Sequence, residues 1–271
     1  MSQDDNPKVV DSWAGLQEEL FKDSLRDIGR HRLNYIFRGM ANAEWDLRTS
    51  LGRLQTPHYN PEHLLIRAFK KYAYLQTKGL NEWHILALAQ HHGLPTRILD
   101  WSISPYIAAH FATDDMEQMD KDGVIWCVDA TKGYQQLPDV LQRKIEQEYA
   151  YVFTVDMLDE IAPDLKTFDA LKEEPFLVFF EPPSLDERIV NQYAMFSVLS
   201  DARLRLDDWL EGKKELYRKL VIPARFKWEL RDRLDQLNIT ERVIYPGLDG
   251  LCKWIKRYYT HKDAIQPKKE G

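Results

Sequence analysis

The sequence is poor in cysteine, has no long apolar run and contains no glycine-rich phosphate loop. Cys127 and Cys252 lie far apart, which excludes a disulfide framework or a cysteine-rich zinc site and favours two buried, reduced thiols. The longest apolar stretches, such as residues 176–180, are far shorter than the ~20 residues of a membrane-spanning helix. Because the polar start does not resemble a signal peptide, we expect a cytoplasmic protein without a membrane partner.

The sequence contains enough apolar residues for a sizeable core, and its charge is unevenly distributed along the chain. Hydrophobic residues make up 44% of the 271 positions, which excludes the disordered and low-complexity classes. Residues 1–200 hold 20 Lys and Arg against 31 Asp and Glu, whereas residues 201–271 hold 17 against 12. Cations and aromatics alternate at 253–259 and could contact nucleic acid. Helical spacing there instead favours aromatics packed against the protein on one face of a terminal helix, with the lysines in water.

Apolar periodicity and turn residues predict alternating helices and strands. Ser12 caps a helix that includes Ile28, Gly39 stops a strand over 33–38, and Asn60 with the following proline opens a helix whose apolar stripe runs to Leu75. Further helices are expected at 81–92, 104–112, 137–174, 185–194, 223–237 and from 249, and further strands at 96–101, 124–128, 176–180, 195–199 and 216–222. The irregular alternation predicts an α+β fold, with mixed, largely antiparallel small sheets and flanking helices.

Three clusters of polar residues could carry chemistry, although the third, residues 181–196 with Glu181, Asp186, Glu187, Arg188 and Gln192, is by itself typical of a polar helix. Arg38 and Gly39 end a predicted strand, where an arginine can clamp a phosphate or a carboxylate, or form a structural salt bridge. The second cluster is the string at 90–102, where strand alternation places Asp100 on the face opposite Arg97 and Trp101. A half-buried Asp100 needs a partner such as Arg38, Arg97 or a histidine.

The histidines of this region do not form a convincing metal site. His84, His91 and His92 lack a ligand spacing typical of zinc, so no metal is expected. As neighbours on a helix, His91 and His92 cannot share one face, which argues against a joint role. A nuclease or other hydrolase that uses one of them with Asp100 is one alternative, although no nucleophile motif supports it.

The tripeptide at 37–39, the string QHHGLPTRILDWSISPYIAAHFA at 90–112, RIVNQYAMF at 188–196 and IYPGLDGL at 244–251 together resemble the bacterial FRG domain. The resemblance predicts a short N-terminal helical region at 1–32, a single FRG domain at 33–260 and a basic, flexible tail at 261–271. It does not by itself imply an activity.

Parts of the chain also resemble ADP-ribosyltransferases of the arginine–serine–glutamate type, which implies a related fold and NAD as the substrate. The family order of an aromatic-Arg-Gly strand, a serine strand, a V-A-x-x-F helix and a hydrophobic strand is similar to residues 37–39, 100–102, 107–111 and 124–133 here. Gln192 stands where that family has a glutamate, so Asp100, Glu181 or Glu187 would have to supply the carboxylate. The resemblance implies catalytic roles for Arg38, Asp100, Ser102, Gln192 and Glu187. It implies cofactor binding by Phe37, Arg38, Gly39, His92, Thr96, Arg97, Trp101 and Ser102.

In that interpretation, Arg38 clamps the pyrophosphate, Ser102 holds the nicotinamide ribose, and Trp101 or a nearby aromatic stacks on nicotinamide. The acceptor is an unknown protein or nucleic acid, and a toxin or phage-defence role would imply an antitoxin or regulatory partner. The alternative from another class is a module that binds a nucleotide, nucleic acid or protein without turnover.

Overall fold

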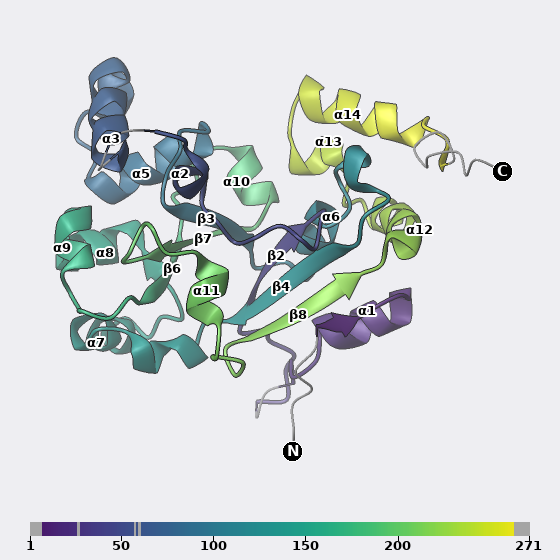
Figure 1. Ribbon diagram of the computed structural model, residues 1–271, viewed down its shortest axis with the longest axis horizontal. Helices are drawn as coiled ribbons and strands as arrows, with labels where there is room; N and C mark the ends of the chain where they lie inside the picture. Colours follow the sequence, from purple (N-terminus) through teal and green to yellow (C-terminus); the bar gives the residue numbers. More distant parts are fainter. Residues whose placement is uncertain (1–6, 26–27, 57, 59–60, 263–271) are drawn as a thin grey trace.

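The computed structural model of the protein describes residues 7–25, 28–56, 58 and 61–262. Across this part of the chain, eight strands form one sheet in the order β1-β8-β4-β2-β3-β7-β6-β5 (Figure 1). Neighbours are antiparallel except at the two edges, where β1 runs parallel to β8 and β5 to β6. The strands are β1 (Lys8–Val9), β2 (Tyr35–Met40), β3 (Ile98–Ser102), β4 (Gly123–Asp129), β5 (Phe153–Thr154), β6 (Leu177–Glu181), β7 (Ala194–Leu199) and β8 (Tyr217–Ile222). The fold is α+β as predicted, but with one continuous sheet instead of several small ones.

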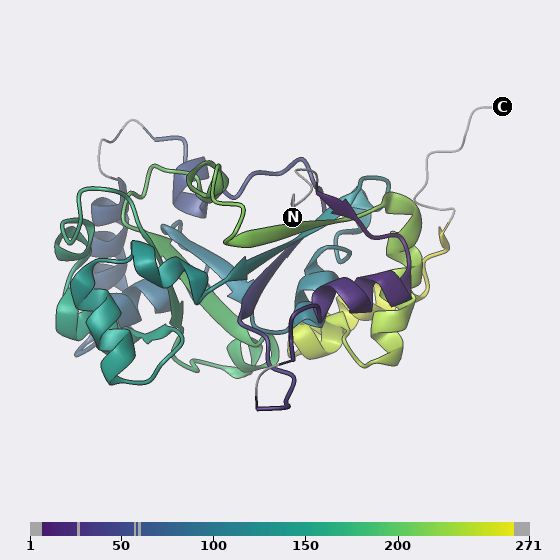
Figure 2. The same ribbon diagram turned by 90° about the horizontal axis from the view of Figure 1, so that it is seen from below.

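The helices gather around the two ends of this sheet. One group surrounds the β7-β6-β5 end and the other the β8-β4-β2 end, and Figure 2 shows the groups on either side of the central strands. The first group is α3 (Pro61–Tyr72), α4 (Tyr74–Thr77), α5 (Glu82–His91), α7 (Asp139–Gln147), α8 (Val155–Ile161) and α9 (Leu165–Asp169). The second is α1 (Trp13–Leu20), α6 (Pro105–Phe111), α12 (Ala224–Gln236), α13 (Glu241–Ile244) and α14 (Leu248–Tyr258). Short elements complete the chain: α2 (Ser50–Arg53), α10 (Glu187–Asn191), α11 (Leu206–Leu210) and the 3-10 segments η1 (Met116–Gln118) and η2 (Lys132–Gln136).

Alternation along β3 separates two hydrophobic cores, as the sequence predicted. Ile98 joins the cluster formed with α5, α7 and α8, whereas Leu99 and Trp101 join a cluster on the other face with α11. Because successive side chains of a strand point to opposite faces, Asp100 lies on the face away from Trp101. That face carries the cleft described below.

Gly39 does not end a strand, contrary to the prediction, because β2 continues through it to Met40. The glycine instead allows α6 to lie directly on β2. A Cβ atom at Gly39 would stand 1.7 Å from the carbonyl oxygen of Ala108 in α6. Only a residue without a side chain permits this approach, so Gly39 fixes how α6 lies against the centre of the sheet.

Strands β2 and β3 are neighbours but barely pair. They share one registered pair, Phe37 with Ser102, whereas β2 and β4 share six. The two strands therefore splay apart from that pair in the middle of the sheet. This separation positions the candidate site.

Two predicted boundaries near the N-terminus need correction. Ser12 caps α1 by accepting a hydrogen bond from the backbone N–H of Gly15, but the helix ends at Leu20 and Ile28 lies exposed outside it. The expected cap Asn60 of α3 lies outside the described residues. Helix α3 ends at Tyr72, so Leu75 lies beyond it and is exposed, whereas Phe69 of the stripe is partly buried against the core and Ile66 is buried.

The C-terminal region also differs from expectation. Cys127 is buried as predicted, but Cys252 on α14 is exposed. From residue 263 on, the predicted basic tail lies outside the described residues. Among the helices that the structure describes, none combines the length and apolar composition required to cross a bilayer.

Candidate functional site

A cleft of about 240 Å³ opens where β2 and β3 splay apart, and we call it the split cleft. Arg38 of β2, Asp100 and Ser102 of β3, and Gln192 just before β7 all line it. Four residues that the sequence analysis assigned to catalysis therefore surround one hollow. The other lining residues are Phe37, Gly39, Gln90, His91, Trp101, Phe111, Arg188, Ile189, Ala194 and Phe196.

Arg38 bridges the gap between the two strands. Its Nη1 donates a hydrogen bond to the backbone oxygen of Asp100, where backbone pairing has ended. Its Nε is buried and has no hydrogen-bond partner among the described residues. Burial lowers the pKa of Arg38 from its ordinary value, and nearby Asp100 opposes that shift. The guanidinium thus remains a cation with unused donor capacity at the wall of the cleft.

Asp100 is held by a chain of side-chain hydrogen bonds. Its Oδ2 accepts from Nε2 of Gln90 at 2.7 Å, and Oε1 of Gln90 accepts from Oγ1 of Thr96 at 2.5 Å. The surrounding protein raises the pKa of Asp100, although its side chain faces the open cleft and Arg38 and Gln90 act in the opposite direction. A carboxylate so placed can stabilise a developing positive charge on a ligand.

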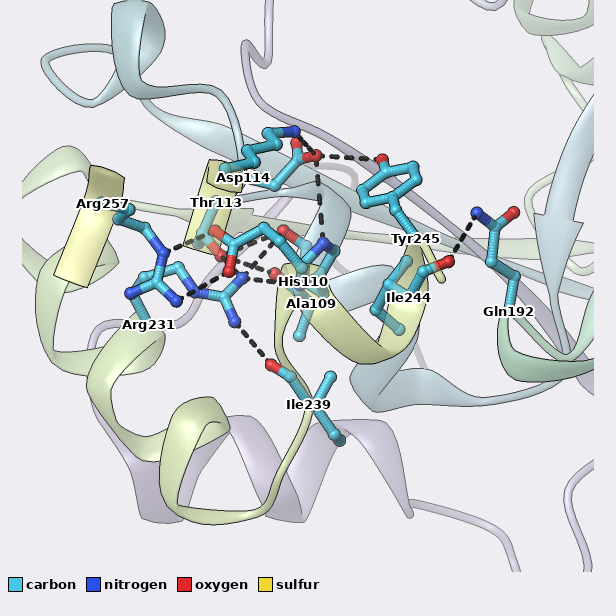
Figure 3. A network of polar contacts seen from close by, with 12 residues as sticks. Ala109, His110, Thr113, Asp114, Gln192, Arg231, Ile239, Ile244, Tyr245 and Arg257 are labelled. Carbon is cyan, nitrogen blue, oxygen red and sulfur yellow. Dashed lines mark hydrogen bonds and ion pairs between the residues drawn. The ribbon is translucent and has the colours of Figure 1, made fainter. Parts of the chain in front are cut away.

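Ser102 and Gln192 are bonded to the protein itself. Oγ of Ser102 donates to the backbone oxygen of Gln192 at 2.7 Å and accepts from the backbone N–H of Ser104 at 3.0 Å. Nε2 of Gln192 donates to the backbone oxygen of Ile244 at 3.3 Å (Figure 3). These side chains therefore join β3, β7 and α13 around the cleft, which differs from the ligand contacts expected for them.

Two larger hollows adjoin the split cleft. One of about 710 Å³, the α10–α14 wing, shares His91 and Arg188 with it. The other, of about 570 Å³, shares Arg38, Gly39 and Phe111 with it. Each of these two hollows is within the size range of small-molecule sites, and each adjoins the split cleft through the shared residues.

The α10–α14 wing contains a histidine and an aspartate in contact. Nε2 of His91 lies 2.7 Å from Oδ2 of Asp186, the N-cap of α10. Burial alone would raise the pKa of Asp186, but the backbone N–H of Ile189 and His91 outweigh it and hold the pKa below its ordinary value. His92 lines the same wing with its ring edge-to-face on His91, because the two residues lie where α5 ends. Both histidines therefore line the wing, although the sequence analysis argued that neighbours on a helix cannot share one face.

Glu187 lines the α10–α14 wing but not the split cleft. Glu181, at the end of β6, is exposed and lines neither. Within the described ranges, Asp100 is therefore the carboxylate that lines the split cleft.

Three residues assigned to cofactor binding have buried structural positions. Arg97, on the opposite face of β3 from Asp100, donates to Glu62 and Asp169. The ring of Trp101 is buried and its Nε1 donates to Oγ of Ser197 at 2.8 Å, so it cannot stack on a ligand in the cleft. Thr96 is fully buried and acts only through Gln90. Arg97 thus lies outside the split cleft and the buried ring of Trp101 lies at its wall, and the cofactor roles of all three residues stay predictions.

Residues 33–121 match the family model of the FRG domain. The resemblance to the FRG domain is thus confirmed for this segment. The match covers about a third of the chain and includes β2, α5, β3 and α6, with Arg38, Gln90 and Asp100. Comparison with curated proteins and with solved structures found no match.

The part of the site beyond the FRG match comes from α10, β7 and the C-terminal helices. A polar network holds those helices against α6 of the FRG domain (Figure 3). Asp114 accepts from the hydroxyl of Tyr245 at 3.2 Å and from Nζ of Lys253 at 2.9 Å. Nδ1 of His110 lies 2.9 Å from Nη1 of Arg231, and burial with this cation lowers the pKa of His110 well below its ordinary value. His110 is therefore a neutral structural residue.

Sequence reasoning missed Gln90 as the partner of Asp100 and Arg188 as a second cation of the cleft. The signal for Gln90 was its place in the same string as Asp100, ten positions earlier at the end of the preceding helix. Arg188 stands in the FRG-like string at 188–196. Its position in the cleft depends on Tyr245, 57 positions further along the chain, whose ring centre lies 5.4 Å from the guanidinium. The described residues contain no group of three or more His, Cys, Asp and Glu side chains arranged to hold a metal ion.

Proposed function

We propose that the split cleft binds NAD and that the protein transfers ADP-ribose from it. The observation that carries the proposal is the adjacency of β2, β3 and β7 in the sheet, with Arg38, Ser102 and Gln192 around one cleft. These are the elements that the resemblance to ADP-ribosyltransferases singles out. Arg38 is the group to bind the pyrophosphate, since a guanidinium matches the geometry of phosphate oxygens.

Asp100 supplies the charge that the reaction requires. As the glycosidic bond breaks, nicotinamide leaves with the bonding electron pair and the ribose carbon becomes positive. A carboxylate beside that carbon lowers the barrier by electrostatic stabilisation. Asp100 faces the cleft that Gln192 adjoins, so it takes the part that a glutamate before β7 would otherwise play.

A second candidate function is binding of a nucleotide without turnover. It is favoured by the hydrogen bonds of Ser102 and Gln192, which leave both side chains engaged with the protein rather than turned to a ligand. In that case Arg38 and Arg188 provide affinity for phosphates, and Asp100 only holds its place beside Arg38.

The two functions are separated by measuring the NAD-induced thermal shift together with nicotinamide release. We expect Asp100→Asn to keep the thermal shift and to lower release at least about 100-fold. Arg38→Lys keeps the positive charge but loses the paired N–H donors of the guanidinium, and should weaken NAD binding roughly tenfold or more. Because the pKa of Asp100 is raised, release should increase with pH through a value above that of an ordinary aspartate.

Glu181→Gln is the matched control, since it removes an exposed carboxylate outside the cleft. A thermal shift without release in the wild type would support binding without turnover. No NAD-induced shift in the wild type would refute both functions, and release that is unchanged in Asp100→Asn would refute the role of Asp100.

A further inference from the structure

Helix α14 turns its aromatic side outward, the reverse of the sequence expectation. Its buried residues are Gly250 and Arg257. Nε of Arg257 donates to Oε1 of Glu241 at 2.5 Å and Nη2 donates to Oδ1 of Asp235 at 2.7 Å. This buried ion pair fixes the rotation of the helix and leaves Tyr258 and Tyr259 exposed, while Trp254, three positions before Arg257, is half-buried.

The outward side carries adjoining aromatic rings. Tyr258 is 59% exposed and Tyr259 is 81% exposed, and their ring centres lie 5.3 Å apart. Half-buried Trp254 continues the row, 5.2 Å from Tyr258. The guanidinium of Arg242 stacks over Trp254 at 4.5 Å. Such exposed aromatic rings and stacked guanidinium groups present flat surfaces to which a further planar group can stack.

Cations accompany these rings. Lys253 and Lys256 lie on α14 and Arg242 on α13, with Lys253 also paired to Asp114 at 2.9 Å, while the exposed acidic residue of α14 is Asp249 in its first turn. The helix belongs to the segment 201–271, where 17 Lys and Arg stand against 12 Asp and Glu in a chain of net charge −6. The surface is thus locally basic on an otherwise acidic protein, which favours an anionic partner.

We propose that this surface binds a single strand of nucleic acid. The α14 face, as we call it, consists of Arg242, Lys253, Trp254, Lys256, Tyr258 and Tyr259. Bases would stack on the aromatic rings while the cations contact phosphates, the combination that single-strand binding uses. A folded duplex hides its base faces, so the exposed rings favour an unpaired strand over a double helix.

The α14 face continues toward the candidate site. Lys253 also lines the α10–α14 wing, together with His91 and Arg188, which both reach the split cleft. A strand on the α14 face therefore lies beside the cleft, where it could serve as the acceptor of a transferred group. Binding to the α14 face does not depend on NAD, so this proposal stands or falls separately from the proposed function.

A protein partner or a second copy of the chain is less favoured. Leu248 and Ile255 are exposed on the same helix and would suit an apolar contact. However, α14 spans only 11 residues, about 16 Å, and a single pair of such helices buries less area than the about 1,200 Å² typical of a stable interface. The charged residues beside the rings would also meet like charges in a second copy.

The test is fluorescence anisotropy of labelled oligo-dT and oligo-U of about 12 nucleotides with the full chain. With about four phosphate contacts, we expect affinity to fall roughly 50-fold between 50 and 200 mM salt. The double substitution Tyr258→Ala with Tyr259→Ala should weaken binding roughly tenfold or more. Lys256→Gln should lower the slope of log affinity against log salt by about 0.7.

The matched control is Tyr72→Ala with Tyr74→Ala, a pair of equally exposed tyrosines at α3 and α4. These substitutions should leave binding unchanged, and thermal denaturation checks that every variant is folded. Absence of oligonucleotide binding at 50 mM salt would overturn the proposal. So would equal loss from both tyrosine pairs, or light scattering that shows a dimer dissociated by the α14 substitutions without any oligonucleotide binding.

Discussion

Arg97 tests which side of β3 carries the function. Its Nε donates to Oε1 and Oε2 of Glu62 at 3.0 and 2.8 Å, its Nη2 donates to Oε2 of Glu62 at 2.6 Å, and its Nη1 donates to Oδ1 of Asp169 at 2.5 Å. Arg97 and Glu62 are buried, whereas Asp169 is partly exposed. This network joins β3, α3 and α9 on the face away from the split cleft.

Removing Glu62 alone should strongly lower the free energy of unfolding, whereas replacing both Glu62 and Arg97 by apolar residues should lower it little. Glu62→Ala leaves Arg97 buried with only Asp169, which we expect to cost about 3–5 kcal/mol of unfolding free energy. For a chain of this size that corresponds to a loss of roughly 10 °C in Tm. The double variant Arg97→Met with Glu62→Leu replaces the pair by apolar side chains and should recover most of the loss.

Urea unfolding of the wild type, Glu62→Leu, Arg97→Met and their double variant measures the coupling, which should exceed about 2 kcal/mol. The NAD-induced thermal shift of the double variant should equal that of the wild type, because Arg97 does not reach the cleft. A double variant as unstable as Glu62→Ala would refute the account of a buried charge pair. A stable double variant that lost its ligand shift would place Arg97 in the site after all.

Three further outcomes follow from buried positions. Gly39→Ala should destabilise the protein by at least about 3 kcal/mol in urea unfolding, because its Cβ would meet the backbone of α6, while Gly133→Ala, with open space around it, should be near neutral. Burial lowers the pKa of Lys227 from 10.5 to about 8, so the unfolded chain binds the extra proton between those values. Unfolding free energy should therefore rise by up to about 3 kcal/mol from pH 8 to 10.5, and Lys227→Met should lack this rise. Cys252 should react with a thiol reagent in the folded protein, whereas Cys127, buried and with its pKa raised to about 12, should react only on unfolding.

Local signals in the sequence predicted most elements around the site. Asn81 caps α5 through its side chain, as expected, and Pro105 occupies the first turn of α6. A helix cap and a first-turn proline act within a few residues, so they can be recognised in the sequence without knowledge of the tertiary structure. Local signals could not predict that the strands form one sheet, because the pairing of β3 with β7 joins residues almost 100 positions apart.

Burial at the ends of the molecule was harder to predict than element type. The periodicity of α14 was read correctly, but the buried partners of Arg257 reverse which side faces inward. Those partners lie on α12 and α13, so no pattern within α14 reveals them. A similar limit applies to α3, where buried Glu62 owes its position to Arg97 of β3 rather than to the apolar stripe.

For the site, alternation along β3 was a better guide than closeness in sequence. It placed Arg97 and Trp101 opposite Asp100, yet both were also assigned to the cofactor because they stand in the same motif. The structure keeps the alternation: Arg97 does not line the split cleft, whereas Trp101 lines it with a buried ring. Consecutive residues of a strand can line one cleft, as Phe37, Arg38 and Gly39 do, but their side chains point to alternate faces.

The three residues of the FRG tripeptide occupy their positions for different physical reasons. Phe37 is fully buried in the core shared by α1, α6 and α12, and Gly39 admits the backbone of α6. Arg38 alone reaches across the splayed strands, where a buried Nε still lacks a partner among the described residues. Two of the three residues therefore build the cleft and one can bind in it. Arg38 shares the split cleft with Asp100 of β3 and with Arg188, which lies beyond the matched segment.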